Sequence, residues 1–231
     1  MTSAVRHFPG DAVFTTSVKA MQQRLGSREI YAHVESEGGW PAAIPPVLKT
    51  FIEAQTSVFL ATANAGGQPY IQHRGGPAGF LQVLDERTIA FADFRGNRQY
   101  ITLGNLADNP RAHLFLMDYA RRRRVKIWGT ARAVEDRELI GRLMPQGYAA
   151  LPERAILFTV EAWDRNCSQH IPQRIDAADV QAALSERDAR IQALETEVAQ
   201  RAQRVHALEE EVAQLRARSA SQIDTNRLAS T

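Results

Sequence analysis

The spacing of apolar residues changes from helical to strand-like at about residue 57. Upstream, Val18, Met21 and Leu25 recur at helical intervals. The run VLKTFIEAQ follows two prolines and predicts a second helix, because a proline at a helix start loses no hydrogen bond. Downstream, short apolar runs bounded by turn residues predict strands. These runs are SVFLATA, PYIQH, GFLQVLD, TIAFAD, AHLFLMD, VKIWGTARAVE and AILFTVEAWD.

Two helical patterns interrupt the strands. One helix is predicted to begin at Asn97 and to stop at Pro110, and DRELIGRL predicts another before the last strand. A parallel sheet needs long connections between successive strands, and most connections here are too short. We therefore expect a mainly β (α+β) fold, an antiparallel barrel with peripheral helices.

The C-terminal part has a different pattern. After Pro172 there is no proline, glycine or aromatic residue, and apolar residues recur with a period of seven. The heptad a positions are Leu184, Ile191, Val198, Val205 and Val212, and the d positions are Val180, Arg187, Leu194, Arg201, Leu208 and Leu215. Mostly β-branched residues at a with leucine at d favour a parallel two-stranded coiled coil.

The residues that flank this apolar stripe are consistent with a dimer. In a parallel homodimer the predicted g–e pairs are Arg190–Glu195, Glu197–Ala202, Arg204–Glu209 and Glu211–Arg216. Three pairs have opposite charges and none has like charges. The alternative is a solvated single helix lying on the globular domain. The two arginines at d weaken the coiled coil, so its pairing would depend on a dimer made elsewhere.

These patterns divide the chain into four segments. We expect an N-terminal helical and loop segment over residues 1–49, a barrel over 50–175, a coiled-coil helix over 176–218 and a disordered tail over 219–231.

Composition narrows the function classes. The 231 residues carry 28 Lys and Arg against 26 Asp and Glu, a formal net charge of +2, which argues against a nucleic-acid binder. The single cysteine cannot form an internal disulfide. No apolar run approaches the roughly 20 residues of a membrane helix, and the first residues lack a signal-peptide pattern. We expect a cytoplasmic protein with no membrane or nucleic-acid partner.

The stretch QHRGGPAGF, residues 72–80, is the most distinctive candidate site. Paired glycines after a cationic residue let the backbone approach a flat or anionic ligand. A barrel corner that needs glycine in order to bend explains the same residues at least as well.

The stretch FRGNRQ provides a second candidate, at a predicted helix start. Arg95, Asn97, Arg98 and Gln99 lie where free backbone N–H groups and the helix dipole favour a phosphate. The alternative is an ordinary asparagine cap with exposed arginines.

The stretch NCSQH, residues 166–170, follows the last predicted strand. Cys167 beside His170 suggests a nucleophile and a base, although a small thiol lining a pocket explains it better. No catalytic residue is assigned. The six histidines lack metal-ligand spacing, so no metal is expected. In the run Arg121–Arg124, only Arg124 enters a predicted strand.

Four blocks together resemble the flavin-nucleotide-binding proteins related to pyridoxamine 5′-phosphate oxidase, whose fold is an FMN-binding split β-barrel. The blocks are HRGGPAGF, FADFRGNRQYITLGNLADNPRAHLFL, RRVKIWG and AWDRNCSQHIPQR. The resemblance covers about residues 10–175. It implies FMN as cofactor, contacted by His73, Arg74, Gly75, Gly76, Pro77, Ala92, Asp93, Asn97, Arg98, Gln99, Arg124, Asn166, Cys167 and His170.

The resemblance also implies roles. The Arg-led strand element falls on residues 74–77, although an ungapped match shifts it toward residues 77–82. The phosphate element becomes residues 97–99, where Gln99 replaces the lysine of the oxidases. Arg124 takes the place of a flavin-binding glutamine, and NCSQH would wall the flavin site. The oxidases' C-terminal Arg-x-His substrate signature is absent, which makes pyridoxamine phosphate a doubtful substrate.

The resemblance therefore predicts a homodimer with the flavin at the subunit interface. The expected activity is that of a flavin-dependent oxidoreductase acting on a small organic substrate, with NAD(P)H a candidate electron donor. One alternative is a non-enzymatic flavin-binding or redox-sensing protein whose coiled coil engages a partner. A second is a deazaflavin-dependent reductase on the same barrel, and a third, resting on Arg121–Arg124 alone, is a nucleic-acid-binding protein.

Overall fold

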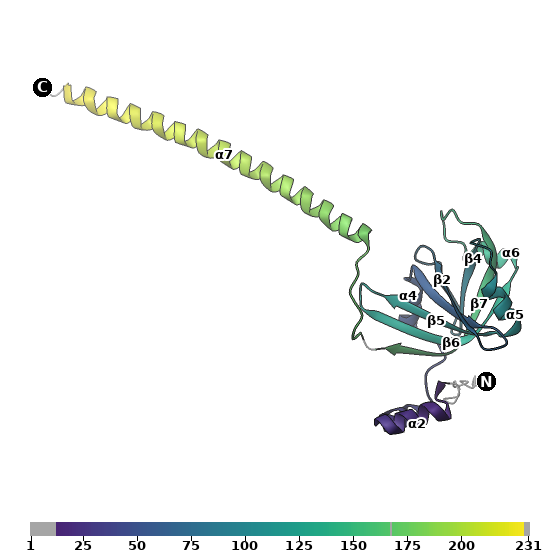
Figure 1. The fold of residues 1–231 in the computed structure, drawn as a ribbon. Coiled ribbons are helices and arrows are strands. Elements are labelled where there is room, and N and C mark those ends of the chain that lie inside the picture. The colour runs from purple at the N-terminus through teal and green to yellow at the C-terminus, as the bar shows by residue number, and fades with distance from the viewer. Residues whose placement is uncertain (1–12, 167, 229–231) are drawn as a thin grey trace, which may run out of the picture. The chain divides into compact units, whose positions relative to one another are not determined.

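The chain divides into two compact units, with the boundary between Arg174 and Ile175. The computed structural model describes residues 13–166 and 168–228. The first unit contains an antiparallel sheet with short helices, and the second consists of one helix (Figure 1).

Seven strands form one antiparallel sheet that curls around a core (Figure 1). They are β1 (Ser57–Ala63), β2 (Pro69–Gly75), β3 (Gln82–Asp85), β4 (Thr88–Phe94), β5 (Arg111–Asp118), β6 (Arg123–Val134) and β7 (Pro152–Asn166). Their order is β2-β1-β5-β6-β7-β4-β3. Because β2 and β3 form the two edges of the described sheet, the barrel is not closed. This confirms the predicted antiparallel split barrel.

The core lies on one face of the sheet because apolar residues alternate along the strands. In β1, β5 and β6, buried residues alternate with partly exposed ones. Leu60, Leu114 and Ile127 are neighbours across these three strands and are completely buried. Burial of each such side chain contributes roughly 1.5–3 kcal/mol.

A bulge lets the longest strands bend around this core. The register between β6 and β7 shifts at Trp128 and Gly129. A Cβ at Gly129 would lie 2.0 Å from the carbonyl oxygen of Thr159, so only glycine fits this close approach of two backbones.

Five short helices belong to the described part of the first unit, and four of them follow signals in the sequence. They are α2 (Thr16–Leu25), α3 (Arg28–Ser36), α4 (Pro46–Glu53), α5 (Ile101–Asp108) and α6 (Arg137–Leu143). Pro46 opens α4, which buries Leu48 and Ile52 in the core. The Asp136 carboxylate accepts hydrogen bonds from the first turn of α6.

One helix of the N-terminal segment was not predicted. Helix α2 ends at Gly26, whose φ of +78° suits a left-handed cap. Helix α3 follows at once but has no buried residue, so its sequence REIYAHVES lacks the apolar stripe that would identify it. Trp40, after α3, stacks on Trp128 with ring centroids 5.2 Å apart and thereby attaches this segment to the sheet.

The second unit contains the helix α7 (Ala177–Leu228). It continues past Arg218, where the sequence predicted a disordered tail. The later residues lack the heptad but contain neither proline nor glycine, so nothing in them ends a helix. Within residues 13–166 and 168–228, no helix combines the length and the apolar character needed to cross a membrane.

Candidate functional site

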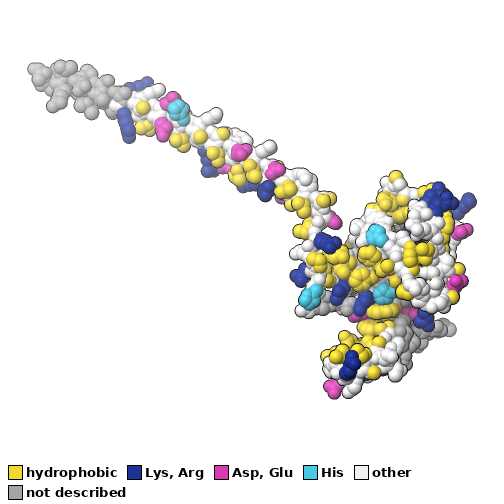
Figure 2. Space-filling view, viewed as in Figure 1, with side chains coloured by type: hydrophobic (Ala, Val, Ile, Leu, Met, Phe, Trp, Pro, Cys, Tyr) yellow, Lys and Arg dark blue, Asp and Glu magenta, His cyan; other side chains and the backbone are white. Residues whose placement is uncertain are grey.

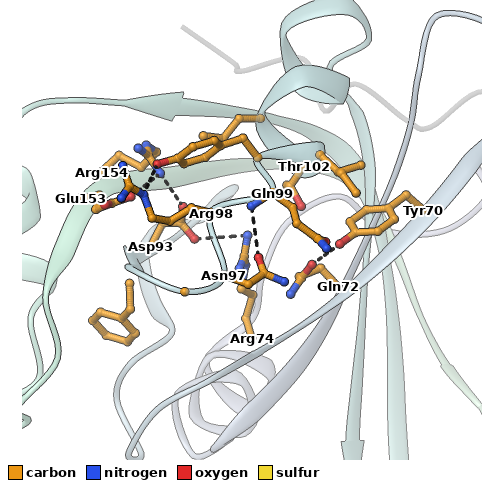
Figure 3. Close-up of a pocket in the computed structure, with 15 residues that line it drawn as sticks. Tyr70, Gln72, Arg74, Asp93, Asn97, Arg98, Gln99, Thr102, Glu153 and Arg154 are labelled. Atoms are coloured by element: carbon orange, nitrogen blue, oxygen red, sulfur yellow. Dashed lines mark hydrogen bonds and ion pairs between the residues drawn. The ribbon is translucent and has the colours of Figure 1, made fainter.

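A cavity of about 180 Å³ opens between β2, the end of β4, the start of α5 and the start of β7. Figure 3 shows its polar side chains pointing toward one another across this space. The lining residues are Tyr70, Gln72, Arg74, Asp93, Phe94, Gly96, Asn97, Arg98, Gln99, Tyr100, Ile101, Thr102, Leu103, Glu153 and Arg154.

Strand β2 contributes every second residue to the cavity. Tyr70, Gln72 and Arg74 all line it, because side chains two apart lie on the same face of a strand. The Tyr70 hydroxyl donates a hydrogen bond to Gln72 Oε1. The wall formed by β2 therefore offers a phenol, an amide and a guanidinium.

Asp93 lies between two arginines at the base of the cavity. Its side chain is only 6% exposed, with Oδ1 3.2 Å from Arg74 Nη2 and Oδ2 3.2 Å from Arg154 Nη1. Arg154 faces Asp93 directly in the pairing of β4 with β7. The contact with Arg74 lacks hydrogen-bond geometry, so Arg74 Nε and Asp93 Oδ1 are buried without a hydrogen-bond partner.

Glu153 extends this line of alternating charges. Its carboxylate accepts a hydrogen bond from Arg95 Nε at 2.9 Å and lies 3.2 Å from Arg154 Nη1. The hydrogen bond from Arg95, with a smaller effect of Arg154, holds the pKa of Glu153 below its usual value. Two carboxylates face the three arginines Arg74, Arg95 and Arg154, so the cluster keeps one net positive charge.

The start of α5 differs from the prediction. The helix was expected to begin at Asn97, but it begins at Ile101. The Asn97 Oδ1 accepts a hydrogen bond from the Gln99 backbone N–H at 3.3 Å, which closes a turn before the helix. Arg98 and Tyr100 then adopt left-handed φ values of 60° and 55°. Two non-glycine residues in this region mark a strained loop, a feature common at binding sites.

Because of this loop, the first turn of α5 has no side-chain cap. Tyr100 occupies the N-cap position and makes no capping hydrogen bond. Thr102 and Leu103, in the first turn, line the cavity. The first N–H groups of a helix have no partner within the helix, so this end attracts an anion.

Arg98 and Tyr100 form the rim above the helix start. Arg98 Nε donates a hydrogen bond to the Tyr100 hydroxyl at 3.1 Å, a contact that raises the pKa of the guanidinium. The Arg154 guanidinium lies 5.6 Å from the centre of the Tyr100 ring. Arg98 is exposed and carries a permanent positive charge beside the helix start.

These features fit a phosphate monoester. The uncapped helix start and the side chains of Arg98 and Arg74 line the same cavity. Such groups supply charge-assisted donors to phosphate oxygens. Gln99 offers an amide where a lysine would add a further charge.

The structure brings together five of the predicted site residues. Arg74, Asp93, Asn97, Arg98 and Gln99 line the cavity. The predicted residues outside its lining are His73, Gly75, Gly76, Pro77, Ala92, Arg124 and His170. Asn166 ends β7, its side chain is not described, and Cys167 lies outside the described residues.

His73 on β2 and Arg124 on β6 do not line the cavity. The His73 ring packs against Phe59 with centroids 5.6 Å apart, on the face of β2 opposite Arg74. Arg124 is the second residue of β6 and has a buried Nε without a hydrogen-bond partner.

The paired glycines have a packing role. A Cβ at Gly76 would lie 2.7 Å from the Cβ of Phe80, which is 2% exposed. Gly76 also donates its backbone N–H to the Thr56 carbonyl at 3.1 Å. Close packing of the chain at this corner accounts for the glycine, as the alternative interpretation proposed.

The arginine-rich turn between β5 and β6 holds the segment that follows β7. Arg122 Nε donates to the Ile171 carbonyl at 3.1 Å, and Gln173 Nε2 donates to the Ala120 carbonyl at 2.9 Å. The Arg174 guanidinium lies 4.6 Å from the Tyr119 ring centre. His170, in this segment, has a left-handed φ of 62°. These contacts give Arg122 a structural role.

Sequence reasoning missed several lining residues, chiefly Tyr70, Gln72, Tyr100, Glu153 and Arg154. The last predicted strand began at Ala155, whereas β7 begins at Pro152. Extending that strand backward would have placed Glu153 and Arg154 beside the end of β4. No group of three or more His, Cys, Asp or Glu side chains is arranged for a metal ion in the part of the chain that the structure describes.

The fold and the cavity define a class of protein, a split β-barrel with a phosphate-suited helix start between its strands. Residues 44–167 match the family model described as pyridoxamine 5′-phosphate oxidase. The match covers more than half of the chain, so the chain belongs to this flavin-binding family. The matched region is shorter than the predicted span of residues 10–175, mainly at the N-terminal end.

Solved structures with the same kind of fold share little sequence with the chain. HupZ from Group A Streptococcus is 19% identical over 57% of this chain and 99% of its own, with a TM-score of 0.45. An FMN-binding protein from Syntrophomonas wolfei is 11% identical over 63% of this chain and 97% of its own, with a TM-score of 0.41. An FAD-binding protein from Mycobacterium smegmatis is 14% identical over 54% of this chain and 96% of its own, with a TM-score of 0.38. No curated protein matches the chain.

Proposed function

We propose that the protein binds FMN and acts as a flavin-dependent oxidoreductase on a small organic substrate. The observation that carries this proposal is the single-phosphate site, where the uncapped start of α5 and the side chains of Arg98 and Arg74 line one cavity. FMN ends in one phosphate monoester, which these donors match in charge and number.

The walls of the cavity suit the sugar chain of the cofactor. The Gln72 amide and the hydroxyls of Tyr70 and Thr102 line the space next to the phosphate donors. These groups both donate and accept hydrogen bonds, as the ribityl hydroxyls require. Asp93 and Glu153 hold Arg74 and Arg154 in place at the base.

The size of the cavity supports a homodimer. Pockets for drug-sized ligands occupy about 300–1,000 Å³, whereas this one encloses about 180 Å³. One protomer would hold the phosphate and the sugar chain, and a second copy would complete the space for the ring system.

The outer face of the sheet, on the side of β2 opposite Arg74, is a further surface that a second copy would cover. Hydrophobic side chains gather there, with histidines among them, on the near side of the barrel in Figure 2. Ile71 on β2 is 61% exposed, and Phe59, Phe115 and Met117 are partly exposed. Such a patch is typical of a protein interface. It also includes His73, which the family resemblance assigns to the flavin.

When bound, FMN supplies hydride or single-electron transfer to the reaction. The protein would anchor the phosphate through Arg98, Arg74 and the α5 N–H groups. If His73, Arg124 or His170 lies near the pyrimidine edge of the ring, a cation there favours the reduced form. Replacing each by a neutral residue and finding the same midpoint potential would dismiss that role.

Two alternatives differ from this proposal in what can be observed. A redox sensor that uses α7 to engage a partner would be reduced by NAD(P)H without turnover on any acceptor. A deazaflavin-dependent reductase would release a cofactor with a different absorption spectrum and mass.

The test is the spectrum of the purified protein and the mass of any molecule released on denaturation. We expect a yellow protein that releases FMN. Arg98→Gln should weaken FMN binding about 10-fold or more, because a charge-assisted hydrogen bond contributes roughly 1.5–3 kcal/mol. Arg142→Gln is the matched control, since Arg142 pairs with Glu138 on the surface of α6. A colourless protein that does not bind added FMN would overturn the proposal.

A further inference from the structure

Helix α7 carries an apolar stripe that is exposed from Val180 to Leu215. The apolar residues at the heptad a and d positions are between 37% (Leu184) and 66% (Val198) exposed. They include three leucines at d, which are Leu194, Leu208 and Leu215. An isolated helix gains most of its stability from packing an amphipathic face. A helix of 52 residues, roughly 78 Å long, with this stripe unpacked therefore lacks its main source of stability.

The residue types in the stripe indicate which kind of helix it packs against. Ile191, Val198, Val205 and Val212 occupy a, and leucine occupies three of the six d positions. β-branched residues at a with leucine at d pack best in parallel two-stranded coiled coils, where each side chain fills a hole on the facing helix. A second copy of the same helix supplies these holes in matching order.

The charges beside the stripe fit a second copy in the same register. The g residue of one heptad lies beside the e residue of the next heptad on a parallel partner. This pairs Arg190 with Glu195, Arg204 with Glu209, and Glu211 with Arg216. Shifting the register by one heptad would instead bring Arg204 near Arg216, a like-charged pair.

The structure also explains how the stripe accommodates an arginine at d. The Arg201 guanidinium lies 2.5 Å from the Glu197 carboxylate, four residues earlier on the same helix. Glu197 is a g residue at the edge of the stripe. The charge of Arg201 is thus drawn toward the edge, and the aliphatic part of its side chain can cover apolar neighbours.

We propose that α7 of one protomer pairs with α7 of a second copy in a parallel, in-register coiled coil over residues 180–218. This surface is separate from the cofactor site, so the proposal does not depend on flavin binding. Because both helices start directly after a barrel, joining the barrels raises the effective concentration of the helices, and joining the helices does the same for the barrels.

Disulfide crosslinking of the full-length protein tests the pairing. The chain has one cysteine, Cys167, so the variants carry Cys167→Ser and one new cysteine, either Leu194→Cys or Leu208→Cys. Under mild oxidation each should form a covalent dimer, because identical d residues face each other in a parallel, in-register pair. Gln203→Cys, at the outward f position, is the matched control and should stay largely uncrosslinked.

Two positions are needed because an antiparallel pair can bring at most one of them next to its own copy. Crosslinking at only one position, at neither, or equally at residue 203 would overturn the proposal. A protein that forms no crosslink but still contains bound cofactor would contradict the coiled coil and leave the cofactor proposal intact.

The strength of the pairing gives a second measurement. Arg201→Leu removes a charge from d and should raise the thermal midpoint for loss of the helical circular dichroism signal. Leu194→Glu with Leu208→Glu should lower that midpoint, and Gln203→Glu, which adds a charge at f, should leave it near the wild-type value. An unchanged midpoint in the double glutamate variant would contradict a coiled coil.

Discussion

His113 shows how the environment of a single residue changes its chemistry. It lies on β5, where its ring meets the edge of Trp128 with centroids 4.9 Å apart. Partial burial, together with the positive charge of Lys126, lowers the pKa of His113 from 6.5 to about 4. The folded protein therefore holds this histidine in its neutral form at physiological pH.

This shift predicts a loss of stability in mild acid. Between pH 6.5 and pH 4 the unfolded chain binds a proton at His113 while the folded chain does not, so the free energy of unfolding falls as the pH falls through this window. The loss should be about 2 kcal/mol between pH 7 and pH 4.5, which allows for the exposed part of the ring. Urea unfolding at both pH values measures it.

The variant His113→Gln should lose that part of the pH dependence. His33→Gln, on the exposed surface of α3, is the control and should behave like wild type. If His113→Gln kept the full wild-type slope, the histidine would not be the group responsible.

At the scale of elements, two glycines differ in whether a side chain would fit at their position. Gly129 lies at the bulge between β6 and β7, where a Cβ would collide with the Thr159 carbonyl and with Phe158. Gly104 lies in α5, where a Cβ would meet nothing within 4 Å.

Alanine substitution should therefore change stability in opposite directions. Gly129→Ala should lower the free energy of unfolding by about 3 kcal/mol or prevent folding, because two backbones must separate. Gly104→Ala should raise it by roughly 0.5–1 kcal/mol, because alanine favours the helix. Equilibrium urea unfolding measures both changes, and a destabilised Gly104→Ala protein would argue against α5 as an ordinary helix at that position.

At the scale of the whole molecule, the boundary between the two units follows the contacts of the segment after β7. Arg122 and Gln173 connect this segment with the turn between β5 and β6, and Arg174 lies over Tyr119. All of these contacts precede Ile175, where the second unit begins.

Truncation after Arg174 should leave the first unit folded. The shortened protein should keep the thermal transition of the barrel and should bind FMN as a dimer, while its helical circular dichroism signal falls. Analytical ultracentrifugation and the flavin spectrum measure this outcome. A flavin-free monomer would show instead that α7 is required for the dimer.

The sequence alone determined much of the fold. Short apolar runs bounded by turn residues predicted the strands, and the run SVFLATA coincides with β1 because the apolar residues of a core strand are adjacent in the sequence. The heptads predicted a helix in the region of α7, since helix-forming composition without proline or glycine is a local property. Five of the residues named from the motifs line one cavity, and their role in flavin binding stays a prediction.

Only the tertiary structure determined the residues of the cavity and the start of α5. These features depend on strand register and on the close approach of residues that are distant in the sequence. Arg154 was recognisable as a site residue only once β7 paired with β4 and placed it opposite Asp93. Helix α5 begins at Ile101 and not at Asn97 because a turn and two left-handed residues precede it. The local sequence pattern does not show whether such a turn or a further helical turn forms. Gly76 proved to accommodate Phe80 because only packing shows which atoms a Cβ would meet. Local pattern thus determined the elements, and contacts between distant residues determined the site.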